Sequence, residues 1–322
     1  MPLKIAYVMD PIAGINIKKD STFAMLEAAQ ARGHQNYYLL PEALYRAPAQ
    51  ADQPAGVRAR MQAVQVQRAE VFYNLAPAED LPLSAMDAVI MRKDPPFDMR
   101  YIYATYLLEQ ASGETLVLNR PDSLRNANEK LYALNFPKHI PRTWVGSDRE
   151  GIKAFVAREG KAILKPIDAK GGEGVFVLRA DDSNLSALLD LMTADGRQPV
   201  IVQQYIPEAK DGDIRVLMID GEVQAAFRRV PQAGEHRANL NAGAQAVAYT
   251  LTETDRAVCA EVGAALRRDG LVFVGLDLIG GHLIEVNVTS PTGMQEALRL
   301  SGVDTATALI QWIETQQHGG QS

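Results

Sequence analysis

The sequence has few of the features that mark secreted, membrane-bound or nucleic-acid-binding proteins. Its 322 residues include one cysteine, Cys259, so no disulfide can form within the chain. No apolar run reaches the roughly 18 residues that cross a bilayer. The start, MPLKIAYVMDP, lacks the long apolar stretch and small-residue cleavage site of a signal peptide. A formal net charge of −6 gives no basic surface for nucleic acid. We therefore expect a cytoplasmic protein with neither a nucleic-acid nor a membrane partner.

Several common cofactor motifs are also missing. The five histidines show neither H-E-x-x-H nor a cysteine at zinc-ligand spacing, which argues against a zinc site. The chain has no G-x-x-x-x-G-K-[ST], and residues 10–14 lack G-x-G-x-x-G, so a bound nucleotide must use another device. Cys259 lies in a helical pattern between valines, which favours an apolar filler over a reactive nucleophile.

The sequence does contain enough apolar residues, 47 %, for a globular enzyme of two or three packed lobes. In the first third of the chain, segments typical of helices alternate with segments typical of strands. The helices are predicted from Ser21 to Gly33 and around Tyr103, Tyr106 and Leu107. Strands are predicted at residues 3–9, 36–40, 88–91 and 115–119. This alternation predicts a parallel α/β sheet. The segment from Pro48 to Arg68, rich in Ala, Gln and Arg, is expected to be a loop or an exposed helix.

Beyond a boundary near Arg120–Pro121, the pattern changes to antiparallel strand pairs with inserted helices. Ser147–Glu150 and Thr252–Asp255 read as capping boxes that begin two helices. Asp220–Gly221 predicts a tight hairpin turn. We expect units at residues 1–121, 122–206 and 207–316, followed by a disordered tail at 317–322.

Lys165 interrupts an apolar strand predicted over residues 161–167. A buried ammonium needs an anion beside it, although an edge-strand lysine could instead reach water. Gly171 and Gly172 follow within a few residues. Such a loop lets backbone N–H groups approach phosphate oxygens closely, but a simple flexible turn is the alternative. Together the lysine and the glycines favour a phosphate site.

Residues 271–288 predict a hairpin that carries oxygen ligands. Glu285 and Asn287 share one face of a strand, whereas Ile284, Val286 and Val288 point to the other. Asp277 lies opposite Glu285 if the loop has three residues, and turns to the other face if the loop has two.

The distribution of apolar residues favours the three-residue loop, because Val274, Leu276 and Leu278 then join the buried face. Asp277, Glu285 and Asn287 would then converge. Magnesium prefers such oxygen ligands and shares its shell with water and phosphate. The alternative is a solvated polar face.

Two further charged segments could bind anions. Arg215 shares a strand face with Asp213, and Arg229 follows beyond the hairpin turn. Arginines beside a metal site suit anionic substrates or developing phosphoryl charge, whereas surface ion pairs are the alternative. Arg92 and Lys93 follow a strand's carboxyl end, where open α/β sheets tend to bind ligands.

Taken together, these segments resemble bacterial glutathione synthetase, a family of the ATP-grasp superfamily, over nearly the whole chain. The matching motifs are Met9–Asp20, Met91–Asp98, Asn128–Lys130, Ile163–Pro166, Lys210–Arg215, Val274–Asp277 and Glu285–Thr292. The resemblance implies a Rossmann-like pre-ATP-grasp domain followed by a two-lobed ATP-grasp fold, which together are α/β and α+β. It also implies a homotetramer.

The resemblance assigns roles to individual residues. Those implied to bind the nucleotide are Lys130, Lys165, Gly171, Gly172, Gln203, Gln204, Tyr205, Ile206 and Asp213. Asp277, Glu285 and Asn287 would hold Mg²⁺ or Mn²⁺. Arg215 and Arg229 would act in catalysis. Lys18, Arg92 and Ser290 would contact the substrate carboxylates.

The reaction implied is the ATP-dependent joining of γ-L-glutamyl-L-cysteine and glycine through an acyl phosphate. Positioning and charge neutralisation suffice for it, so no covalent nucleophile is needed. Alternatives are another ATP-grasp carboxylate–amine ligase, or a non-catalytic ATP-binding regulatory module on the same fold. A nicotinamide dehydrogenase is a more distant alternative, because its fingerprint is missing.

Overall fold

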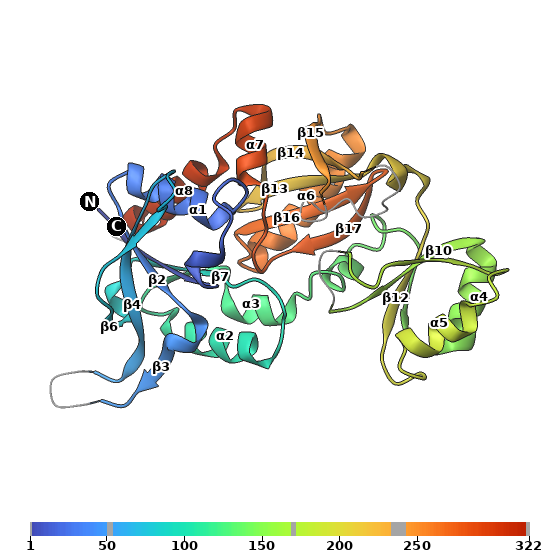
Figure 1. The fold of residues 1–322 in the computed structure, drawn as a ribbon, viewed down its shortest axis with the longest axis horizontal. Helices are drawn as coiled ribbons and strands as arrows, with labels where there is room; N and C mark the ends of the chain where they lie inside the picture. Colours follow the sequence, from blue (N-terminus) through green and yellow to red (C-terminus); the bar gives the residue numbers. More distant parts are fainter. Residues whose placement is uncertain (1, 50–53, 169–171, 233–242, 320–322) are drawn as a thin grey trace.

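The strands of the protein form three sheets, arranged side by side along the long axis of the molecule (Figure 1). The computed structural model describes residues 2–49, 54–168, 172–232 and 243–319. Within these ranges, no helix combines the length and apolar character needed to cross a membrane. Short 3₁₀ helices occur at Ile12–Gly14, Pro41–Ala43, Leu83–Ala85, Tyr132–Asn135 and Pro207–Asp211.

The first sheet has a parallel core, as predicted for an α/β domain. Strand β1 (Lys4–Met9) pairs in parallel with both β2 (Gln35–Leu39) and β7 (Ala88–Arg92), and β7 pairs in parallel with β8 (Leu116–Leu118). Antiparallel strands extend the sheet beyond β2. They are β3 (Leu44–Ala47), β4 (Gly56–Val66), β5 (Tyr73–Leu75) and β6 (Glu79–Pro82).

The structure corrects the expectation of a loop or exposed helix at residues 48–68, apart from residues 50–53, which lie outside the described ranges. Most of this segment forms β4, at 11 residues a long strand. Val57, Ala59 and Met61 are buried, alternating with exposed or more polar neighbours. This period of two is the signature of a half-buried strand. The high helix propensity of Ala, Gln and Arg obscured it, because pairing with β2, β3 and β6 outweighs intrinsic preference.

Helices α1 (Ser21–Ala31) and α2 (Met99–Ala111) flank this sheet. Helix α1 buries Phe23, Leu26 and Ala29, as predicted, and the Asp20 side chain caps it by accepting from the Phe23 N–H. Helix α2 was predicted, but the helix face predicted from Tyr103, Tyr106 and Leu107 was wrong. Tyr103 is 60 % exposed, and Tyr101, Ala104 and Leu108 are buried instead.

The second sheet, in the order β11-β10-β12-β9, is antiparallel, as expected beyond residue 121. Its strands are β9 (Thr143–Gly146), β10 (Lys161–Pro166), β11 (Phe176–Arg179) and β12 (Val200–Gln204). Helices α4 (Arg149–Glu159) and α5 (Leu185–Met192) pack on it to make a small apolar core. The N-cap of α4 is Asp148, not Ser147 as the capping-box interpretation required, because its carboxylate accepts from two backbone N–H groups. Helix α3 (Pro121–Asn126) precedes this region.

The third sheet is antiparallel and holds five strands. They are β13 (Asp213–Ile219), β14 (Glu222–Val230), β15 (Gln245–Ala248), β16 (Phe273–Ile279) and β17 (His282–Asn287), in the order β15-β14-β13-β16-β17. Helix α6 (Glu253–Arg268) covers one face with Val258, Val262 and Leu266 and begins with the predicted Thr252–Asp255 capping box. Cys259 lies on this buried side, and burial raises its pKa to about 12.

The chain ends by returning to its first domain. Helix α7 (Met294–Ser301) leads into α8 (Thr305–Gly319), which packs against α1 (Figure 1). Residues 317–319 are therefore helical rather than a disordered tail, and residues 320–322 lie outside the described ranges. The division at residues 121 and 206 stays a prediction.

Candidate functional site

The central feature of the site is a row of charged residues on neighbouring strands of the third sheet. Arg215 on β13 pairs in register with Asp277 on β16, and Asp277 pairs with Glu285 on β17. Residues opposite each other on neighbouring strands share a face of the sheet. The predicted convergence of Asp277 and Glu285 is therefore confirmed.

The hairpin reaches this register by a route that the sequence did not indicate. Its loop has two residues, Gly280 and Gly281, both at positive φ, instead of the expected three. A bulge then inserts Ile284 between the pairs Leu278–Leu283 and Asp277–Glu285. As a result Leu283 enters the core where Ile284 was expected, and Ile284 is only half-buried.

Asp277 is held by two arginines. Its carboxylate accepts from Arg215 Nε at 2.6 Å and from Arg215 Nη2 at 3.0 Å, and Arg229 Nη2 lies 2.9 Å from its Oδ2. Arg229 in turn donates twice to Asp213, at 2.6 Å each. The four side chains form a buried, alternating chain of charge.

This chain of charge sets the protonation of its acids. Burial would raise the pKa of Asp277, but Arg215 and Arg229 outweigh burial and lower that pKa to about 2. Burial raises the pKa of Asp213 above its ordinary value, despite the pairing with Arg229. Asp277 is therefore a permanent anion at neutral pH.

Asn287 completes the predicted ligand set. Its Nδ2 donates to the Gly275 carbonyl and to Asp277 Oδ2, both at 3.2 Å, which leaves the amide oxygen as its remaining polar end. Glu285 is more open, with a quarter of its side chain exposed. Among the described residues, no three His, Cys, Asp or Glu side chains group closely enough to hold a metal ion. A cation at this place would therefore fill its shell with other oxygens as well, such as the Asn287 amide oxygen, water or phosphate.

Two lysines from the preceding part of the chain face this row. Lys130 Nζ lies 3.6 Å from Glu285 Oε1 and donates to the Ile167 carbonyl at 3.2 Å. Lys165, on β10 of the second sheet, is 7 % exposed. Burial lowers its pKa to about 8, with opposing contributions from Glu285 and Asp277 and a further lowering from Lys130. Lys165 therefore lies close to Asp277 and Glu285, called the acidic row below.

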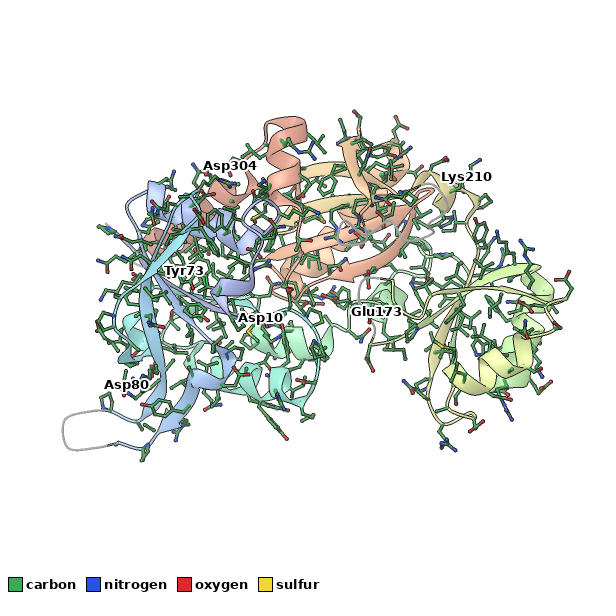
Figure 2. The ribbon with its side chains drawn as sticks, in the orientation of Figure 1. Asp10, Tyr73, Asp80, Glu173, Lys210 and Asp304 are labelled. Atoms are coloured by element: carbon green, nitrogen blue, oxygen red, sulfur yellow. The ribbon has the colours of Figure 1, made fainter. Side chains whose placement is uncertain are left out.

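The glycine-rich segment follows Lys165 directly. Gly172 and Gly174 adopt positive φ of 78° and 67°, a backbone conformation that favours glycine. Gly171 lies outside the described residues. Figure 2 shows Glu173, within this segment, between the second sheet and the rest of the molecule.

The residues predicted to line an adenine pocket lie where the chain passes from β12 of the second sheet to β13 of the third. Gln203 is buried and donates to Thr143 Oγ1 at 2.9 Å, whereas Gln204 is half-buried. The Lys161 ammonium lies 3.3 Å from the centre of the Tyr205 ring, and Ile206 is buried. Asp213 follows at the start of β13, so the structure brings this set to one connection.

The residues predicted to bind substrate carboxylates separate into two places. Arg92 is buried and donates to Thr22 Oγ1 at 3.0 Å and to the Pro291 carbonyl at 3.1 Å. Ser290 donates to the Asp94 carboxylate. Both therefore lie where the first sheet meets the loop after β17.

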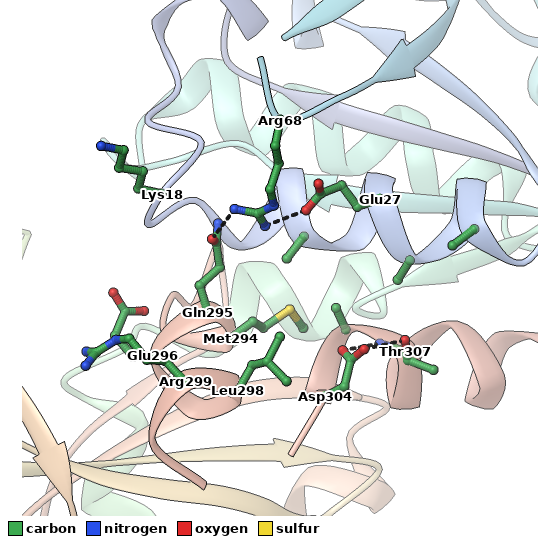
Figure 3. Close-up of a pocket in the computed structure, with 14 residues that line it drawn as sticks. Lys18, Glu27, Arg68, Met294, Gln295, Glu296, Leu298, Arg299, Asp304 and Thr307 are labelled. Atoms are coloured by element: carbon green, nitrogen blue, oxygen red, sulfur yellow. Dashed lines mark hydrogen bonds and ion pairs between the residues drawn. The ribbon is translucent and has the colours of Figure 1, made fainter. Parts of the chain in front are cut away.

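Lys18 lies elsewhere. It is exposed and lines a groove of about 510 Å³ between α1 and the α7–α8 region (Figure 3). Arg68 crosses this groove and bonds Glu27 and Gln295. Lys18, like Arg92 and Ser290, was predicted to contact a substrate carboxylate, but it lies at this separate groove, and its side chain points away from Arg68 and Gln295 in Figure 3.

Glu129 belongs to this site although the sequence assigned it no role. It precedes Lys130 in a motif that was noted for its lysine alone. Its carboxylate accepts from Val288 N, Thr289 N and Thr289 Oγ1, directly beyond Asn287. No periodicity in the sequence links residues so far apart, so only the fold reveals the contact.

Comparisons with known proteins agree with this geometry. Residues 3–125 match the family model described as "Prokaryotic glutathione synthetase, N-terminal domain", and residues 129–302 match "Prokaryotic glutathione synthetase, ATP-grasp domain". A protein of Pseudomonas putida named glutathione synthetase is 46 % identical over 98 % of both chains. One of Pseudomonas aeruginosa with the same name is 48 % identical over 92 % of both chains.

Solved structures share the fold at low sequence identity. D-cycloserine synthetase DcsG superimposes with a TM-score of 0.67 at 18 % identity, over 97 % of this chain and 99 % of that one. The ATP-grasp ligase PsnB, complexed with a minimal precursor, gives 0.65 at 20 %, over 98 % and 100 %. The predicted fold class is confirmed, and the chain is an ATP-dependent ligase. By its two domain matches and its full-length relatives, it belongs to the prokaryotic glutathione synthetase family.

Proposed function

We propose that this enzyme joins γ-L-glutamyl-L-cysteine to glycine, with ATP converted to ADP and phosphate. The observation that carries the proposal is the meeting of Lys130 and Lys165 with Asp277 and Glu285. A triphosphate with a divalent cation needs both kinds of group: ammonium donors for phosphate oxygens and anionic oxygens for the metal. Such a site also suits phosphoryl transfer to a carboxylate.

The acidic row fits a divalent cation. Glu285 and the amide oxygen of Asn287 are its accessible ligands, and Asp277 supplies the fixed negative charge behind them. A bound Mg²⁺ or Mn²⁺ would neutralise phosphate charge during transfer. Glu285 and Asn287 would hold the cation beside the charge of Asp277, whose own oxygens bond the arginines; direct binding by Asp277 stays a prediction, and the choice of metal belongs to this proposal.

The other charged residues divide the remaining tasks. Lys130 and Lys165 would contact the phosphates, with backbone N–H groups near Gly172 beside them; the same role for Gly171 stays a prediction. Gln203, Gln204, Tyr205, Ile206 and Asp213 would hold the nucleoside. Arg215 and Arg229, aligned by Asp277, would stabilise the acyl phosphate, whose attack by the glycine amine forms the new amide bond.

Substrate carboxylates would bind near Arg92 and Ser290. Arg92 Nη1 is buried and has no hydrogen-bond partner among the described residues, so its N–H groups are available to donate to a substrate carboxylate. Lys18 stays a candidate for the outer end of the peptide substrate.

The experiment is phosphate release from Mg-ATP by purified protein, with each substrate left out in turn. We expect release only when γ-glutamylcysteine and glycine are both present, with glutathione formed in equal amount. Release with another carboxylate and amine, and none with this pair, would indicate a different carboxylate–amine ligase. Nucleotide binding without release under any pairing would indicate a regulatory module.

Assembly and location are further parts of the proposal. We propose a homotetramer that acts in the cytoplasm on these small-molecule substrates, without nucleic acid or membrane. Light scattering coupled to size-exclusion chromatography would give the assembled mass, and a mass of one or two chains would contradict the tetramer.

A further inference from the structure

The segment Val288–Met294, called the strap below, follows the metal-ligand strand β17 directly. Side chains from distant parts of the chain hold its beginning and its end. The Ser21 hydroxyl accepts from Gly293 N at 3.1 Å and from Met294 N at 3.3 Å. Arg92 and Arg215 donate to the carbonyls of Pro291 and Thr292. The strap therefore connects the proposed substrate side of the site with its metal side.

Glu129 holds the beginning of the strap. Its Oε1 accepts three hydrogen bonds, from Val288 N at 3.0 Å, Thr289 N at 3.0 Å and Thr289 Oγ1 at 2.8 Å. The Asn119 side chain donates to the carbonyl of Val288 from the other side, at 2.9 Å. Hydrogen bonds to a charged acceptor are about twice as strong as neutral ones. Both backbone polar groups of Val288 are thus fixed by side chains.

The backbone of Glu129 holds the metal strand as well. Its carbonyl accepts from Val286 N at 2.8 Å, the residue between Glu285 and Asn287. The next residue, Lys130, directs its ammonium toward Glu285 at 3.6 Å. A single residue therefore fixes the position of β17, of the strap and of a lysine proposed to bind phosphate.

The surroundings of Glu129 are unfavourable for a charged carboxylate. Burial raises the pKa of the Glu129 carboxyl and the nearby charge of Glu285 raises that pKa further, whereas the hydrogen bonds from the strap oppose the rise. A threonine or asparagine could accept hydrogen bonds from the strap without this repulsion. The bonds to the strap therefore hold the Glu129 carboxyl close to Glu285, a proposed metal ligand.

We infer that Glu129 is a positioning residue, which aligns Lys130, Glu285 and Asn287 for the metal–nucleotide complex by anchoring the strap. The effect of this residue on turnover rests on the proposed function. Its direct consequence is on binding: loss of the anchor weakens the complex of Mg²⁺ with the non-hydrolysable ATP analogue AMPPNP, which needs no turnover to measure.

The test compares Glu129→Ala and Glu129→Gln with a control, Asp255→Ala. Asp255 is buried and also accepts three hydrogen bonds, from Tyr249 and from two groups of Thr252, but on helix α6. Calorimetry gives the affinity for Mg·AMPPNP, and thermal unfolding gives stability. We expect Glu129→Ala to weaken binding about tenfold or more and Glu129→Gln to recover most of the loss, because its amide oxygen still accepts.

The control separates positioning from general stability. Asp255→Ala should lower the melting temperature comparably and leave the affinity within about twofold. Equal affinities for wild type and Glu129→Ala, or equal losses in Glu129→Ala and Asp255→Ala, would overturn the inference. If Glu129→Ala does not fold, Thr289→Val decides: it removes one of the three donors, and we expect binding to weaken about threefold or more. Wild-type affinity in that variant would overturn the inference.

Kinetics distinguish this inference from the proposed function. If wild-type protein forms no glutathione but the Glu129 variants lose Mg·AMPPNP affinity as described, the proposed substrates are wrong and the positioning role stands. If wild type forms glutathione and the variants match it in both affinity and turnover, the positioning role is wrong and the function stands.

Discussion

At the scale of single residues, the charge of Lys165 connects the site to pH. The lysine is buried, and its pKa of about 8 lies below the ordinary 10.5 because burial disfavours the ammonium. Near pH 7 the side chain is mainly protonated in the free protein, and near pH 9 it is mainly neutral. A phosphate that binds beside it prefers the charged form and raises its pKa again.

We therefore predict that affinity for Mg·AMPPNP falls as pH rises through about 8. The loss between pH 7 and 9 should be about tenfold, since the binding site must then take up a proton. Lys165→Arg keeps its charge over this range and should show a flatter profile. Calorimetry at several pH values measures both. Parallel profiles for the two proteins would mean that another group controls the pH dependence.

A second residue-scale prediction separates Glu285 from Arg215. Both substitutions, Glu285→Gln and Arg215→Ala, should lower phosphate release at least a hundredfold. Because Glu285 is partly exposed, Glu285→Gln should change the free energy of unfolding by about 1 kcal/mol or less. Arg215 pairs with buried Asp277, so its loss should cost about 3 kcal/mol or more.

Steady-state assays and urea unfolding of the same preparations check this pair. Wild-type turnover in Glu285→Gln would contradict its place at the metal. The sequence predicted that Arg215 and Asp277 belong to the site, but their direct pairing depends on how β13 and β16 align. The residues next to Arg215 and Asp277 in the sequence do not determine how the two strands align.

At the scale of elements, the sequence pattern predicted those helix starts and buried faces that depend on contacts between residues close in sequence. Helix α6 begins at the predicted capping box and α1 begins at the predicted Ser21, and the inward faces of both follow the predicted spacing. Strand β4 was missed because its stability comes from four partner strands, β2, β3, β5 and β6, and this pairing cannot be predicted from residues 56–66 alone. The β16–β17 hairpin gave the expected register through a shorter loop and a compensating bulge, a combination that loop residues alone cannot reveal.

The buried side of strand β4 can be tested by substitution. Met61 is 1 % exposed, whereas its neighbour Arg60 points outward. Met61→Ala should reduce the free energy of unfolding by about 2 kcal/mol or more, and Arg60→Ala by about 0.5 kcal/mol or less. Urea unfolding of the two variants measures this. Similar, small changes in both would be the behaviour of a loop, and would favour the original expectation over the strand.

At the scale of the whole molecule, the site is assembled from all three sheets. The first contributes Arg92, the second Lys165, and the third the acidic row. The sequence could order these motifs along the chain and, through family resemblance, predict that they meet. It could not show that α8 returns to pack on α1, because long-range packing of this kind leaves no local signal.

Because the ligand would connect the second and third sheets, its binding should stabilise the protein as a whole. With Mg·AMPPNP at about a hundred times its dissociation constant, we predict a gain of about 2.7 kcal/mol and a higher melting temperature. AMPPNP with a metal chelator should give a smaller shift, since the acidic row would then repel the phosphates. Equal shifts with and without metal would argue that the row holds no cation.

The proposed function depends most on one placement: Lys165 and the acidic row must bind the same triphosphate. A crystal structure with Mg·AMPPNP measures this directly. We predict that Lys130 and Lys165 contact phosphate oxygens, while Glu285 and Asn287 bind the magnesium that those phosphates share. A nucleotide bound instead in the groove between α1 and α7, beside Lys18 and Arg68, would contradict the proposed site and with it the ligase mechanism.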